Sequence, residues 1–110
     1  MSTTKRMRMT PAFEAEMILR IGHKLDDKDI LLRAAEILEE RGWCQGHYRH
    51  GGAFCAMGAI KEAAPLNSEA MNALDALSRR VEPHVAAWND HPSRTASEVI
   101  AKLREVAASC

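Results

Sequence analysis

The sequence predicts a mainly α-helical protein, a compact bundle of four to five short helices with a small β-hairpin or structured loop at about residues 43–55. Apolar side chains recur at helical spacing along most of the chain. Aromatic residues make up only 5% of the sequence, whereas 46% is hydrophobic. This composition suits packed helices better than a β-sandwich, whose strands favour aromatic and β-branched residues.

The N-terminal part divides into an arm and the start of the helical domain. Residues 1–9 lack periodicity and are predicted to form a flexible arm, whose basic residues are Lys5, Arg6 and Arg8. Residues 10–110 are predicted to form a single helical domain, as this length suits one compact unit. Its first helix begins at Thr10, because threonine caps free N–H groups and the following proline suits the first helical position.

The clearest helix is predicted to begin at Asp26 or Asp27, because aspartate accepts hydrogen bonds from free N–H groups at a helix start. Its apolar stripe consists of Ile30, Leu31, Ala34, Ile37 and Leu38. Gly42 fits the C-terminal cap, since glycine adopts positive φ without strain.

The next segment predicts a short hairpin, with a structured loop as the alternative. Strands are expected at about 43–48 and 53–55, and His50-Gly51-Gly52 suits the tight turn between them. A helix rich in small residues follows at 56–64. Pro65 ends it.

A further helix is expected to begin at Asn67 or Ser68, either of which is a good N-cap. If Asn67 caps this helix, Leu66 and Met71 form a hydrophobic staple across its first turn. Pro83 interrupts the apolar stripe that follows.

The C-terminal part predicts one helical turn at 83–88, a tight turn at 89–92 and a last helix. Thr95 and Glu98 form a capping box at the start of that helix. The large side chains expected to share the core are Trp43, Phe54, Ile60, Leu74, Trp88 and Leu103.

The charge distribution favours a protein partner over a nucleic acid. The chain has 15 basic and 15 acidic residues, and the part after Thr10 has 12 basic and 15 acidic ones. The last helix mixes Lys102 and Arg104 with Glu98 and Glu105, which does not suit a phosphate-binding face. A nucleic-acid-binding helical domain is kept as an alternative.

The sequence predicts a cytoplasmic protein without a membrane span. No apolar stretch approaches the roughly 20 residues that a spanning helix needs, and no apolar signal region follows the basic N-terminus. An odd cysteine count suits a reducing compartment.

Four potential zinc ligands, Cys44, His47, His50 and Cys55, lie close together in the sequence with the spacing C-x2-H-x2-H-x4-C. Thiolate and imidazole are the ligands that tetrahedral zinc prefers. However, a strand across 43–48 would direct Cys44 and His47 to opposite faces. We therefore expect no cofactor and keep a small zinc-binding module as the alternative.

A cysteine nucleophile is a second alternative. Cys44 follows a helix C-terminus, where the dipole opposes a thiolate, whereas Cys55 precedes a helix whose dipole is expected to lower its pKa. His84 or His47 would be the base. Because no orienting residue or oxyanion donor is evident, we predict a protein that is not an enzyme.

Two loops are predicted to contact a partner protein, because polar and aromatic loop residues on a rigid scaffold commonly form contact sites. Their residues are His47, Tyr48, Arg49 and His50 at the hairpin tip, and Asn89, Asp90 and His91 in the later turn. For Asn89 and Asp90 the alternative is a structural role within their turn, with Trp88 anchoring it in the core. Homo-oligomerisation stays open.

Several pieces of the sequence together resemble a known family. They are AAEILEERGWCQG at 34–46, CAMGAI at 55–60, WND at 88–90, RT at 94–95 and EVI at 98–100. In this order they resemble DUF6197, a family of unknown function from actinobacteria and their phages. The resemblance implies that the first two pieces share one structural unit, and it supplies no catalytic or binding residues. A phage-like origin implies a small binding or regulatory protein that acts on a host protein.

Overall fold

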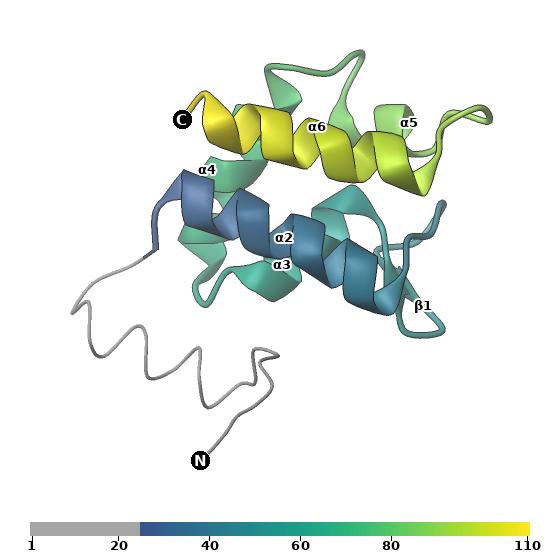
Figure 1. Ribbon diagram of the computed structural model, residues 1–110, viewed down its shortest axis with the longest axis horizontal. Coiled ribbons are helices and arrows are strands. Elements are labelled where there is room, and N and C mark those ends of the chain that lie inside the picture. Colours follow the sequence, from purple (N-terminus) through teal and green to yellow (C-terminus); the bar gives the residue numbers. More distant parts are fainter. Residues whose placement is uncertain (1–24) are drawn as a thin grey trace.

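The computed structural model describes residues 25–110, which form a mainly α-helical unit with one small hairpin (Figure 1). The predicted fold class is confirmed. The elements are α2 (Asp27–Arg41), β1 (Arg49–His50), β2 (Ala53–Phe54), α3 (Ala56–Ala63), α4 (Asn67–Ser78), α5 (Val85–Asn89) and α6 (Ala96–Ala108). The basic arm predicted for residues 1–9 and the helix predicted to begin at Thr10 lie outside the described residues.

Helix α2 is the centre of the packing. It lies beside α6 and also contacts α3 and α4 (Figure 1). Small side chains of α2 and α3, such as Ala34 and Ala59, are fully buried and allow the helix backbones to approach closely. Of the side chains expected in the core, Phe54, Ile60, Trp88 and Leu103 are buried, whereas Trp43 and Leu74 are partly buried against it.

Local capping signals set three of the helix ends. Asp26 caps α2, with its Oδ1 accepting a hydrogen bond from the amide of Asp29 at 3.0 Å. Gly42 ends the same helix with a φ of 101°. Thr95 and Glu98 form the predicted capping box at the start of α6. These three predictions are confirmed because each depends on hydrogen bonds within one helical turn.

The prediction for the start of α4 is wrong. The N-cap is Leu66, without a side-chain hydrogen bond, and Asn67 is already helical. The condition for the predicted staple is therefore not met, and Leu66 and Met71 are 54% and 51% exposed. Pro65 directly precedes the cap, so this helix begins just after a proline and without a polar cap.

The hairpin is shorter than the sequence suggests. Its strands pair Arg49 with Phe54 and His50 with Ala53 in antiparallel register, and the turn glycines have φ values of 59° and 90°. The turn is as predicted, but a strand across 43–48 is wrong. Trp43 makes only an isolated parallel bridge to Phe54, and the residues after it bond to the end of α5 and to the turn beyond it.

None of the described helices could cross a bilayer. The longest, α2, has 15 residues, and a span needs about 20 apolar residues.

Candidate functional site

The side chain of Asn89, the last residue of α5, joins three separate segments of the chain. It is only 1% exposed. Its Oδ1 accepts hydrogen bonds from the indole N–H of Trp43 at 2.7 Å and the amide of Ala56 at 3.0 Å. Its Nδ2 donates to the carbonyl of Cys44 at 3.1 Å and to Asp90 Oδ1 at 2.9 Å. These four bonds use the full hydrogen-bonding capacity of the amide.

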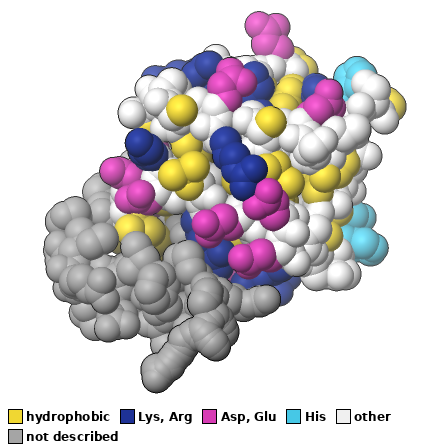
Figure 2. Space-filling view, viewed as in Figure 1, with side chains coloured by type: hydrophobic (Ala, Val, Ile, Leu, Met, Phe, Trp, Pro, Cys, Tyr) yellow, Lys and Arg dark blue, Asp and Glu magenta, His cyan; other side chains and the backbone are white. Residues whose placement is uncertain are grey.

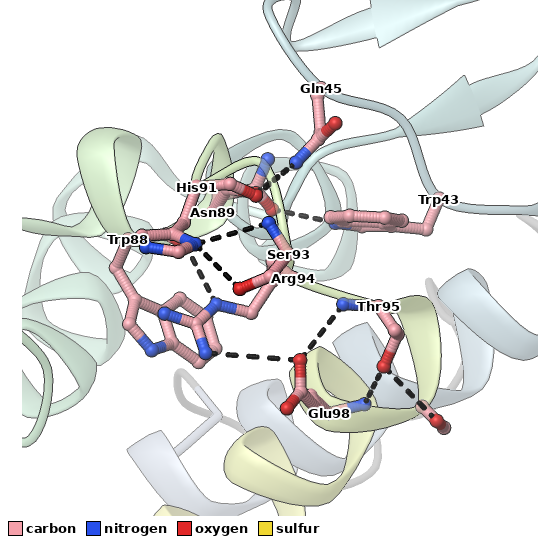
Figure 3. Close-up of polar contacts among 10 residues, drawn as sticks. Trp43, Gln45, Trp88, Asn89, His91, Ser93, Arg94, Thr95 and Glu98 are labelled. Atoms are coloured by element: carbon pink, nitrogen blue, oxygen red, sulfur yellow. Dashed lines mark hydrogen bonds and ion pairs between the residues drawn. The ribbon is translucent and has the colours of Figure 1, made fainter.

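Further bonds tie the loop after α2 to the turn after α5. Gln45 Nε2 donates to the carbonyls of Asn89 and His91 at 3.1 and 2.8 Å (Figure 3). The amide of Gly46 donates to Asp90 Oδ1 at 2.9 Å. We call the side chains and backbone of Trp43, Gln45, Gly46, Asn89 and Asp90 the Asn89 network. This network holds two loops in one fixed arrangement.

The expectation that Asn89 is an exposed contact residue is wrong, because its side chain is buried and fully hydrogen-bonded within the Asn89 network. The structural alternative holds here: Trp88 is 7% exposed and anchors the turn. Arg94 lies 4.6 Å from the Trp88 ring and donates through Nε to the Trp88 carbonyl at 2.9 Å (Figure 3). Asp90 and His91 remain exposed.

The hairpin tip is exposed, as expected. Tyr48 is 54% exposed, and Lys61 Nζ lies 4.9 Å from its ring centroid. The rings of His47 and His50 stack with centroids 4.9 Å apart, and Arg49 covers the Phe54 ring. Histidine side chains accordingly gather at one edge of the molecule in Figure 2, the end at which Figure 1 shows the hairpin and the turn after α5.

An open hollow of about 420 Å³ lies between the two predicted contact loops. Such a volume lies within the roughly 300–1,000 Å³ of ligand pockets. Its lining residues are Gly46, His47, Tyr48, Cys55, Met57, Ala86, Asn89 and Asp90. We call this the loop hollow. It unites four of the seven predicted contact residues, whereas Arg49, His50 and His91 are not among the residues that line it.

Met57 and Ala86 are wall residues that the sequence analysis did not identify. Met57 lies on α3 and Ala86 on α5, two helices in contact, and α3 also approaches Tyr48 closely. A Cβ added to Gly58 would overlap the Tyr48 carbonyl, and the amide of Cys55 donates to that same carbonyl at 3.1 Å. The glycine in the CAMGAI piece was the available sequence signal for this approach.

The electrostatics of the loop hollow favour one stable negative charge. The hydrogen bond from the Asn89 side chain, followed by that from the Gly46 amide, lowers the pKa of Asp90 below its usual value. Asp90 is therefore ionised at neutral pH.

The pKa of Cys55 differs from the sequence expectation, whereas that of Cys44 is shifted in the direction that disfavours a thiolate, as expected. Burial raises the pKa of Cys55 and outweighs the hydrogen bond that its sulfur accepts from the Gly58 amide at 3.3 Å. Burial also raises the pKa of Cys44. The expected lowering at Cys55 is wrong, because desolvation of a thiolate exceeds the favourable field of a helix N-terminus. The proposed bases are not paired with either thiol: Nδ1 of His84 caps α5 by accepting from the Ala87 amide.

The four potential zinc ligands serve local contacts in the structure. Cys44 Sγ donates to the His47 carbonyl at 3.4 Å, while Cys55 caps α3. Within residues 25–110, no group of three or more His, Cys, Asp or Glu side chains is placed to hold a metal ion. The expectation of no cofactor and the zinc-binding alternative both stay predictions for elemental analysis to test.

The basic residues on α6 are paired with acids. Lys102 lies 3.2 Å from Glu105, and Arg104 lies 2.7 Å from Glu39. Acidic and basic side chains are interspersed on the face shown in Figure 2. This mixture does not form the continuous basic surface that phosphate binding needs.

Comparison with known proteins assigns a family. The model of the family of unknown function DUF6197 matches residues 23–109. No curated protein and no solved structure matches the chain. The matched span contains the Asn89 network and both walls of the loop hollow, and the chain belongs to the DUF6197 family.

Proposed function

We propose that this chain is a small, non-enzymatic binding or regulatory protein that uses the loop hollow to hold a segment of another protein. One observation carries the proposal: the Asn89 network fixes two exposed loops that both line one hollow. Loops held by a rigid scaffold are frequent contact sites, and a pre-organised site loses less entropy on binding.

The residues around the loop hollow suit protein contact. Tyr48 exposes more than half of its surface and Arg49 lies beside it on the hairpin. Tyrosine and arginine are enriched among residues that dominate interface energies. Because the sequence resembles actinobacterial and actinophage proteins, we propose that the partner is a host protein and that the chain acts in the cytoplasm.

A capture experiment tests the proposal. The tagged full chain is incubated with an actinobacterial lysate, and retained proteins are identified by mass spectrometry. We expect a specific partner whose retention falls at least tenfold with Tyr48→Ala and is unchanged with Lys28→Ala. Lys28 lies in the first turn of α2, the end away from the hairpin, and is a matched exposed control.

Three results would contradict the proposal. The first is equal retention of every protein by Tyr48→Ala and the unaltered chain. The second is stoichiometric zinc that Cys44→Ser abolishes, which supports the metal-binding alternative. The third is modification of Cys55 by a thiol reagent at neutral pH as fast as a free thiolate reacts, which supports a cysteine-dependent activity.

A further inference from the structure

A second hollow adjoins the loop hollow. It has a volume of about 310 Å³ and is lined by Met57, Met71, Leu74, Asp75, Ser78, His84, Val85 and Ala86. Met57 and Ala86 line both hollows. The two hollows are therefore neighbours, and we call them together the Met57 groove, whose lining comes from α3, α4, α5 and the loop before β1.

The floor of the Met57 groove is apolar. Met57, Leu74 and Ala86 line it, and Met71 on α4 exposes 51% of its surface there. Methionine is flexible and polarisable, so that it adapts to varied apolar side chains and is common at peptide-binding surfaces. An exposed methionine beside a partly buried leucine favours an apolar occupant.

The charged groups of the Met57 groove are negative. Asp90 lines the first hollow and Asp75 lines the second, whereas the lining residues of both, taken from the described part of the chain, include neither lysine nor arginine. Asp75 already pairs with Arg79 at 2.7 Å. Asp90 accepts hydrogen bonds from the Gly46 amide and the Asn89 side chain, and no lysine or arginine within residues 25–110 pairs with it. The imidazole of His47 lines the same hollow, and its charge makes a smaller contribution to the lowered pKa of Asp90.

We infer that the Met57 groove binds an amphipathic segment of another protein that lays apolar side chains against Met57 and Met71 and directs a lysine or arginine to Asp90. This inference rests on the proposed function and names the chemistry of its partner. An acidic segment would bring like charges together and is disfavoured. A short helix with apolar residues at i, i+3 and i+4 suits a groove of this kind.

Selection from a displayed library of random 12-residue peptides on the immobilised full chain tests the inference. We expect enriched peptides to combine apolar residues at helical spacing with at least one lysine or arginine. A synthetic copy of the most enriched peptide is then titrated by fluorescence anisotropy. Asp90→Asn is expected to weaken its binding about fivefold, and Met71→Ser by a similar factor.

The variants are chosen to preserve the fold. An asparagine at position 90 still offers an oxygen to the Gly46 amide and the Asn89 side chain, and Met71 is half exposed. Lys28→Ala is the control and is expected to leave binding unchanged. Circular dichroism and the midpoint of thermal unfolding verify each variant.

Enrichment of acidic peptides, absence of enrichment, or binding insensitive to both Asp90→Asn and Met71→Ser would overturn the inference. The proposed function is judged separately by the lysate experiment. A captured protein whose retention depends on Tyr48 but not on Asp90 or Met71 would leave the proposed function standing and remove this inference.

Discussion

Asn89 and Glu69 are two polar side chains that the fold buries to the same degree, and their surroundings are opposite. Each is 1% exposed. The Asn89 amide makes four hydrogen bonds that connect α5 to the loop after α2 and to α3. The Glu69 carboxylate, in the first turn of α4, has no hydrogen-bond partner for either oxygen within residues 25–110.

Buried polar groups can therefore have two different roles. Asn89 specifies the fold, whereas Glu69 is a polar group that the fold tolerates. A satisfied buried amide fixes the relative positions of the groups it bonds, and removing it leaves those groups unpaired. A buried carboxylate without a partner destabilises the folded state. The helix dipole at the start of α4 offsets a part of that cost.

The largest expected effect comes from Asn89→Ala. It leaves the indole N–H of Trp43 and the amide of Ala56 without their acceptor, and it should lower the free energy of unfolding by about 3 kcal/mol. Urea denaturation measures this change. Asn72→Ala, on the exposed surface of α4, is the control and should change it by less than about 0.5 kcal/mol. Equal effects of the two variants would show that the Asn89 network is not a stabilising feature.

Glu69→Met should raise the free energy of unfolding, whereas Asn89→Ala lowers it. Methionine has a similar length and removes a buried polar group without a partner, so we expect the free energy of unfolding to rise by about 1 kcal/mol. This value allows for the favourable interaction with the helix N-terminus that the substitution also removes. Urea denaturation again provides the measurement. Glu82→Gln, at an exposed position, should be neutral. Destabilisation by Glu69→Met would mean that the carboxylate has a favourable interaction in solution.

Trp43→Phe sharpens the comparison by removing a single donor to Asn89. The expected loss is about 1 kcal/mol, the net contribution of one hydrogen bond. In a double-mutant cycle, most of this loss should disappear when Asn89→Ala is already present. Tyr48→Phe removes the hydroxyl group from an exposed ring and is the control. Additive losses in the cycle would contradict the direct bond from the indole to the asparagine.

The smallest expected effect is the contribution of Asp90 to the loss of stability at acidic pH. Because folding lowers its pKa from the usual 3.8, Asp90 contributes stability that is fully present above that value and is lost as the pH falls through the folded pKa. Asp90→Asn should therefore lose less stability than the unaltered chain on acidification from about pH 5 to about pH 2. Unfolding midpoints across this range check the sign. Parallel curves would show that the hydrogen bonds from Asn89 and Gly46 do not favour the charged carboxylate.

The candidate site was predictable in its parts and not in its assembly. The sequence marked the hairpin tip and the turn at 89–91 as contact loops, and the structure places His47, Tyr48 and Asp90 in the lining of one hollow. It did not identify Met57 and Ala86, because alanine and methionine on short helices look like ordinary core residues in a sequence. The pKa of Cys55 was also misjudged, since burial is a property of packing rather than of position beside a helix.

By itself, the sequence determined the features that depend on residues a few positions apart. The Asp26 cap, the Gly42 helix end, the glycine turn of the hairpin and the Thr95–Glu98 capping box all arise within one turn of backbone. Only the tertiary structure decided the burial and the hydrogen-bond partners of Asn89, whose side chain bonds to residues 33 to 46 positions away. The physical reason is that a hydrogen bond between distant segments forms only after helix packing has brought them together, so that no local spacing encodes it.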